Sequence, residues 1–142
     1  MGCSRSFGEM YSKEECELRI KQGLCRNCGL RPLLEGKRTC HICLSSAART
    51  HAKFRTVILD YFGNCCACCG ETEPLFLAID HINNDGNIQR RQDNTGGANF
   101  YRRIAKSILA GKPPIDLQLL CCICNWGKHR NKGICPHQVG TS

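Results

Sequence analysis

Long hydrophobic runs and aromatic side chains are scarce in this sequence. Aromatic residues make up 6% of its 142 residues, with a single tryptophan. No stretch approaches the roughly 20 apolar residues of a membrane-spanning helix, and residues 1–10 lack the apolar segment of a secretory signal. We therefore expect neither a large conventional core nor a membrane span, and we expect the chain to work inside a cell.

Cysteine is abundant where aromatic residues are not. The chain has 14 cysteines, and most of them fall in pairs with two residues between the partners. This is the spacing with which two thiolates bind one zinc ion. Disulfides would stabilise an exported chain of this size, but because residues 1–10 lack an apolar segment we do not expect export. The pattern favours zinc, with metal sites supplying the stability that the small core cannot.

Positive charge exceeds negative charge by a moderate amount. The formal net charge is +8, but that figure counts thiols as neutral, and each four-thiolate zinc site carries about −2. Two such sites leave about +4, which still favours an anionic partner such as a nucleic acid. Local clusters of basic residues should matter more than this total.

The first half of the chain contains one double zinc knuckle and two predicted helices. Residues 1–10 should be disordered, although Gly2 and Cys3 match an acylation pattern. Residues 13–22 predict a short helix with Gly23 as its stop, and residues 47–62 a connecting amphipathic helix that ends at Gly63. Between them lies a zinc-ribbon-like module whose predicted ligands are Cys25, Cys28, Cys40 and Cys43. Two interpretations of this module stay open, a DNA-contacting accessory and a structural staple.

The second half is organised around an adjacent carboxylate and imidazole, Asp80 and His81. They follow a predicted strand at residues 75–79, and a second strand is predicted at 115–120, before a helix at 125–132. Asp and His together can hold a hard divalent metal and offer a base near neutral pH. The pair is bracketed by two knuckles, predicted to form one zinc site from Cys66, Cys69, Cys121 and Cys124. Cys65 and Cys68 fall outside the chosen register and are predicted to be small buried side chains or unused thiols.

Residues 83–114 form a long polar connection with one predicted helix, at 98–109. Positive charge is concentrated in this connection, beside the Asp80–His81 pair, and it favours contact with nucleic-acid phosphates. The residues concerned are Arg90, Arg91, Arg102, Arg103 and Lys106.

The motifs of residues 64–137, taken in order, resemble the HNH nuclease family. The pieces that match are Cys66-x-x-Cys69-Gly70, Ile79-Asp80-His81-Ile82, Asp116-Leu-Gln-Leu-Leu-Cys121, Cys124-Asn125-x-x-Lys128 and Gly133-x-Cys135-Pro136-His137. The resemblance implies a small, zinc-stabilised α+β protein. A ββα-metal domain at 64–137 would follow a tail, short helix and ribbon at 1–46 and the helix at 47–63, with a tail at 138–142. The closing motif is similar to phage-type members, so the expected source is a virus or mobile element. The protein would then act in the host cytoplasm, or in the nucleus of a eukaryotic host.

The same resemblance implies a mechanism. Asp80 and Asn125 would hold Mg²⁺ or Mn²⁺ through oxygen atoms, and His81 would take a proton from the attacking water. Asp116 stands at the family's middle asparagine and would be structural, and Lys128 would touch backbone phosphate. His129, one helical turn after Asn125, could be a third ligand, a phosphate contact or an exposed residue. Trp126 is predicted to pack, while the roles of Cys135 and His137 stay undecided.

Two functions from different classes therefore compete. The first is metal-dependent hydrolysis of phosphodiester bonds in DNA, with RNA not excluded by the motifs. The second is a non-catalytic zinc module that binds DNA or a packaging or recombination partner. The presence of Asp80, His81 and Asn125 together favours the nuclease.

Overall fold

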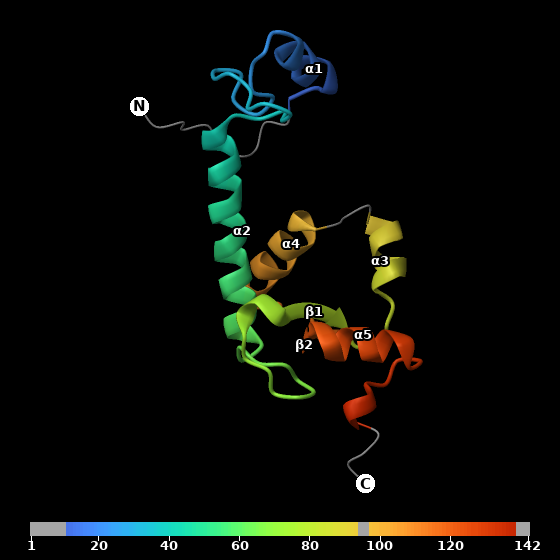
Figure 1. Cartoon of the computed structure of the whole chain (residues 1–142). Coiled ribbons are helices and arrows are strands. Elements are labelled where there is room, and N and C mark those ends of the chain that lie inside the picture. The colour runs from blue at the N-terminus through green and yellow to red at the C-terminus, as the bar shows by residue number, and fades with distance from the viewer. Residues whose placement is uncertain (1–10, 94–96, 139–142) are drawn as a thin grey trace. The chain divides into compact units, whose positions relative to one another are not determined.

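The chain divides into two compact units, residues 1–50 and 51–142. A computed structural model describes residues 11–93 and 97–138, and the expectations for residues 1–10 and for the last residues, 139–142, lie outside that part. Within the described residues there are five α-helices and one two-stranded sheet, which confirms a small α+β fold (Figure 1). None of the helices described is both long and apolar enough to cross a membrane.

The first unit begins with helix α1 (Lys13–Lys21). Its N-terminus is capped as the sequence predicts, because the Ser12 side chain accepts a hydrogen bond from the Glu15 amide at 3.1 Å. Gly23 ends the helix with a φ of 74°, which only glycine adopts without strain. An isolated bridge between Leu24 and Pro32 then closes the first knuckle.

Helix α2 (His41–Tyr61) begins earlier than the predicted start at residue 47. Cys40 directly precedes this helix and Cys43 lies in its first turn, so the second knuckle is helical rather than a loop. The expected boundary after residue 46 therefore falls inside one continuous helix. The C-terminal end agrees with the sequence, since Gly63 follows with a φ of 83°.

The sheet of the second unit pairs β1 (Leu77–His81) with β2 (Leu117–Cys121) in antiparallel register, so that Asp80 lies opposite Gln118. Both strands end one or two residues later than predicted. Strand β1 is displaced because residues 74–76 form the short 3-10 turn η1 (Pro74–Phe76), capped by the Glu73 side chain. Asp80 and His81 consequently lie within the strand rather than after it.

Helix α5 (Cys122–Arg130) follows β2 without a linker and contacts both strands. It starts before the predicted residue 125 because the Cys121 side chain caps it, accepting from the Cys124 amide at 3.4 Å. A final turn, η2 (Pro136–Gln138), packs on α5.

Two helices lie in the connection between the strands. Helix α4 (Ala98–Leu109) has the predicted bounds. Helix α3 (Gly86–Asp93) was not predicted, because its polar sequence lacks the apolar period by which an amphipathic helix is recognised.

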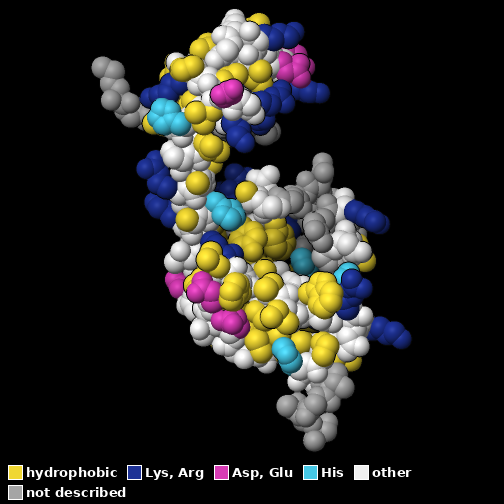
Figure 2. Space-filling model, in the orientation of Figure 1, with side chains coloured by type: hydrophobic (Ala, Val, Ile, Leu, Met, Phe, Trp, Pro, Cys, Tyr) yellow, Lys and Arg dark blue, Asp and Glu magenta, His cyan; other side chains and the backbone are white. Residues whose placement is uncertain are grey.

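Two hydrophobic clusters hold the second unit together. One joins the sheet to the cysteine knuckles and contains Leu59, Leu77 and Leu119. The other lies where α2 and α4 meet the sheet, around Ile58, Ile104 and Leu117 (Figure 1). In Figure 2, hydrophobic side chains also gather on the visible face of this unit, with Lys and Arg at its edges.

Arg55, on the C-terminal half of α2, links that helix to the start of β1. Its guanidinium donates to the carbonyl oxygen of Leu77 at 2.8 Å and to that of Pro74. Arg55 is therefore a structural link from this helix to the chain before the sheet.

Candidate metal centres and catalytic pocket

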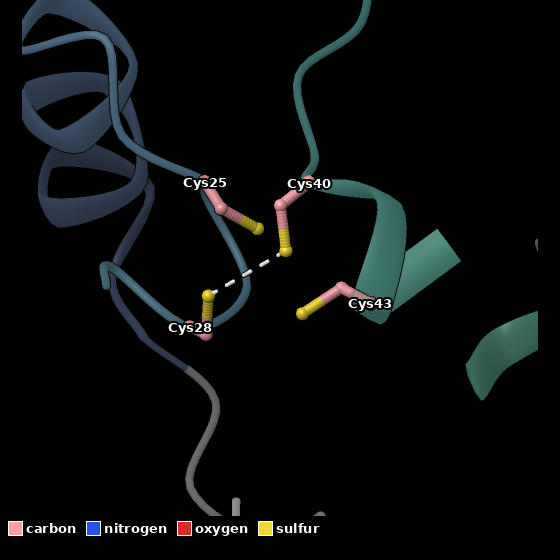
Figure 3. A group of neighbouring side chains, drawn as sticks. All are labelled: Cys25, Cys28, Cys40 and Cys43. Atoms are coloured by element: carbon pink, nitrogen blue, oxygen red, sulfur yellow. Dashed lines mark hydrogen bonds between the residues drawn. The ribbon is translucent and has the colours of Figure 1, made fainter. Parts of the chain in front are cut away.

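The predicted N-terminal cysteines converge on one point. The sulfur atoms of Cys25, Cys28, Cys40 and Cys43, here called the N-terminal group, all lie within 4.8 Å of one another (Figure 3). The Cys28 and Cys40 sulfurs are 3.9 Å apart. Tetrahedral zinc with bonds of about 2.3 Å separates its sulfur ligands by about 3.8 Å, so this group fits zinc.

Backbone amides prepare this group for a metal. Burial alone would raise the pKa of the Cys25 thiol, but hydrogen bonds from the backbone around Cys40, Cys28 and Asn27 lower it to about 6. The turn that aims these amides is closed by Gly29, whose N–H donates to the Cys25 carbonyl at 2.7 Å and whose φ is 63°. A thiolate is therefore favoured at neutral pH, which is the form that binds zinc.

The second predicted set, Cys66, Cys69, Cys121 and Cys124, also meets within 4.8 Å, and we call it the clamp group. The Cys69 and Cys121 sulfurs are 3.6 Å apart, again close to the edge of a zinc tetrahedron. Burial tends to raise the pKa of Cys66, but backbone amides lower it to about 7. The clamp group ties the turn before β1 to the junction of β2 and α5.

A third set was not predicted. Cys68, Cys124, Cys135 and His137, here called the C-terminal group, lie within 4.8 Å of one another and share Cys124 with the clamp group. The Cys124 sulfur is 3.3 Å from His137 Nδ1. Cys68 was not predicted to be a ligand, because the Cys66/Cys69 register was chosen over Cys65/Cys68. The sequence signal for this group was the closing motif Cys135-Pro136-His137, which was left undecided. All three groups could bind metal ions such as zinc.

A pocket of about 210 Å³ gathers the residues expected to carry catalysis. It is bounded by the end of β1, the start of the following loop and helix, and one face of α5. Its lining residues are Ile79, Asp80, His81, Asn84, Gly86, Asn87, Asn125 and His129. Three lining residues were not predicted from the sequence, Asn84, Gly86 and Asn87, and their only signal was their place in the polar turn after His81.

The imidazole of His81 is held between Gly86 and Phe100. A Cβ added to Gly86 would lie 2.6 Å from His81 Nδ1, so only glycine permits this approach. The ring of Phe100, on α4, lies 5.6 Å from the His81 ring, centroid to centroid, with an interplanar angle of 30°. Helix α4 therefore helps to orient the candidate base.

Asp80 is buried and faces α5. Its Oδ2 atom accepts hydrogen bonds from Lys128 Nζ at 2.6 Å and from Gln118 Nε2 at 2.8 Å. Lys128 also donates to the carbonyl oxygen of His81 at 2.6 Å. Lys128 was expected to touch backbone phosphate, and in the structure the residue is 5% exposed and its ammonium pairs with Asp80.

Asp116, which was expected to be structural, joins the chain next to the two strands, because its backbone carbonyl accepts from the Ile82 amide at 2.9 Å. One other expectation needs revision. Trp126 does not pack in the core. It is 62% exposed, and the Arg130 guanidinium lies 5.0 Å from its ring centroid.

The basic residues of the connection are only partly available to a ligand. Arg91, Arg102 and Lys106 are exposed. Arg103 is half-buried, with its guanidinium 5.8 Å from the Phe100 ring centroid. The backbone of Arg90 lies in α3, but its side chain is outside the described part of the structure.

Comparison with family models, curated proteins and solved structures gave no match to this chain.

Proposed function

We propose that this protein is a metal-dependent DNA endonuclease of the HNH type. The observation that carries the proposal is that Asp80, His81, Asn125 and His129 line one pocket together. These residues come from β1 and α5, which are separated by more than 40 positions in the sequence. A structural zinc module needs no such gathering of a carboxylate, an amide and two imidazoles in one concave site.

The chemistry of the lining suits a hard divalent cation. Asp80 and Asn125 both offer oxygen, the donor that Mg²⁺ and Mn²⁺ prefer, whereas the cysteine groups offer sulfur for zinc. Lys128 and Gln118 both donate to Oδ2 of Asp80, so Oδ1 is the atom we assign to the metal. Such an ion, when bound, supplies positive charge against the scissile phosphate and the leaving oxygen.

His81 is the group we assign to water activation. A general base must keep a fixed position relative to the atom it deprotonates, and Gly86 and Phe100 confine the His81 ring. Asp80 and His81 are consecutive in a strand, so their side chains leave on opposite faces. This separation agrees with distinct roles, in which Asp80 reaches towards α5 and His81 towards the substrate.

Plasmid cleavage by zinc-loaded protein tests the proposal. The wild type is compared with His81→Ala, with and without added Mg²⁺ or Mn²⁺, and His51→Ala removes an imidazole that does not line the pocket. We expect cutting that requires the added ion, disappears in His81→Ala and persists in His51→Ala. Folded protein that shifts DNA in a gel without cutting it would favour the non-catalytic binding module. A parallel RNA substrate distinguishes the two nucleic acids.

A further inference from the structure

Cys124 belongs to two groups of metal ligands at once. Its sulfur lies within 4.8 Å of every other sulfur of the clamp group and of every other ligand atom of the C-terminal group. Its side chain is completely buried, and Cys66, Cys121 and Cys135 beside it are nearly so. Six ligand atoms therefore converge around the central sulfur of Cys124, which makes seven ligands in all.

A single ion cannot use this arrangement fully. Zinc in structural sites takes four ligands, so an ion in the clamp group would leave Cys68, Cys135 and His137 without metal. An ion in the C-terminal group would leave three clamp cysteines without metal instead. Either choice leaves three strong ligands gathered at a sulfur that is already in use.

We propose that the clamp group and the C-terminal group together form one binuclear zinc cluster, in which the Cys124 thiolate bridges the two ions. Each ion then has four ligands, and all seven side chains are used. The first ion takes Cys66, Cys69, Cys121 and Cys124, and the second takes Cys68, Cys124, Cys135 and His137 through Nδ1.

The second ion and its own ligands add no net charge to the buried cluster. Two thiols, Cys68 and Cys135, release their protons to solvent, and the imidazole binds as a neutral ligand. Two thiolates and one neutral imidazole offset the two positive charges of the ion. The cluster therefore keeps the net charge of about −2 that a lone four-thiolate site would carry.

The segment that brings the last two ligands is seated by close packing. A Cβ added to Gly127, on α5, would lie 3.0 Å from Pro136 Cδ, so Pro136 rests directly against the helix backbone. Pro136 stands between Cys135 and His137. Its contact with α5 holds both ligands beside Cys124, which lies in the same helix.

Metal counting on the full chain tests this cluster. Native mass spectrometry counts zinc in a Cys28→Ser background, which removes one ligand of the N-terminal group. We expect two ions to remain in this background. Cys65→Ser and Cys122→Ser, whose residues belong to none of the three groups, should keep both ions. A single remaining ion would overturn the proposal.

His137→Ala removes a ligand of the second ion only. Because His137 is exposed, the substitution leaves no cavity in the hydrophobic core. At a chelator concentration that leaves the parent protein fully loaded, this variant should lose one ion and keep the other. Equal retention of both ions would contradict the assignment.

Cadmium substitution tests the bridge itself. Replacement of zinc by ¹¹³Cd should give two resonances from the cluster that are coupled to each other through the shared Cys124 sulfur. Two bound ions whose resonances show no mutual coupling would contradict a shared thiolate.

Discussion

The ammonium of Lys128 lies 2.6 Å from Oδ2 of Asp80, and both side chains are buried. This pair joins β1 to α5 at the edge of the pocket, where Lys128 also donates to the His81 carbonyl. One lysine thus fixes the carboxylate assigned to the metal and the backbone of the assigned base.

Lys128→Met tests the importance of this pair. Removal of one partner leaves a buried carboxylate uncompensated, which costs about 3–5 kcal/mol in the free energy of unfolding. Denaturant titration should show this loss, and Lys53→Met, at an exposed position, should show almost none. Lys128→Met combined with Asp80→Asn should recover part of the stability. If the double variant is as unstable as the sum of the two single ones, the pair is not coupled.

Gly86→Ala should reduce cleavage while leaving the fold intact. The new methyl group would meet His81 Nδ1 at 2.6 Å and push the ring aside. A displacement of about 1 Å at a catalytic group can cost about 100-fold in rate. Adding Gly86→Ala to His81→Ala should cause no further loss, because Gly86 is expected to act through His81. An additional loss in the double variant would assign Gly86 a role independent of the imidazole.

Cys121→Ser and His81→Ala should separate folding from activity. Serine is itself a good helix cap, so the substitution at Cys121 keeps the cap of α5 and removes a metal ligand. We expect circular dichroism to show lost structure in Cys121→Ser and native structure in His81→Ala, with activity absent from both. Cys122→Ser, at an exposed neighbour outside the metal groups, is the matched control. A folded and active Cys121→Ser would show that the clamp is dispensable.

Arg102→Gln with Lys106→Gln should weaken DNA binding in a salt-dependent way. Both side chains are exposed on α4, the helix that contacts His81 through Phe100. Loss of two phosphate contacts should lower the slope of log affinity against log salt by about 2. Fluorescence anisotropy in the His81→Ala background measures this without cleavage, and Arg49→Gln with Lys53→Gln is the charge-matched control. An unchanged slope would exclude these residues from the interface.

Acidification should release metal from the second unit before the first. Protons compete with zinc for thiolates, and a lowered pKa moves that competition to lower pH. In the N-terminal group the pKa values of Cys25, at about 6, and of Cys28 are both lowered, while burial and the neighbouring thiols raise the pKa of Cys43. In the clamp group only Cys66, at about 7, is lowered, whereas burial and the neighbouring thiols raise the pKa of Cys124.

A zinc indicator followed during a pH titration should therefore show two steps. The step at lower pH should disappear in Cys28→Ser, which lacks a ligand of the N-terminal group. Disappearance of the step at higher pH instead would reverse the order.

The parts of the fold that sequence predicted well depend on local patterns. The two cysteines of each predicted knuckle are separated by only two residues, so each pair is brought together locally, and both predicted four-cysteine groups assemble in the structure. The bounds of α4 were also predicted from a local pattern, because its apolar residues recur at the three- and four-residue spacing of one helix face. The capping sequence at Ser12 also acts within one turn.

The parts that sequence did not predict depend on long-range contacts or on polar segments. Lys128 matched a motif, but its burial follows from the packing of α5 on β1, which joins residues 48 positions apart. Cys68 contributes to the C-terminal group only because the chain end returns to the knuckle. Strand β1 starts at Leu77 rather than at residue 75, because residues 74–76 form the turn η1, which the Glu73 side chain caps.

Helix α5 also sets an order for folding. It has nine residues, fewer than the roughly 12–15 that an isolated helix needs to persist in water, and its N-cap, Cys121, is a cysteine of the clamp group. Asn125 and His129 both lie on this helix. A newly synthesised chain would therefore assemble its pocket only after zinc has been taken up. The supply of zinc, rather than of magnesium, would decide when the pocket forms.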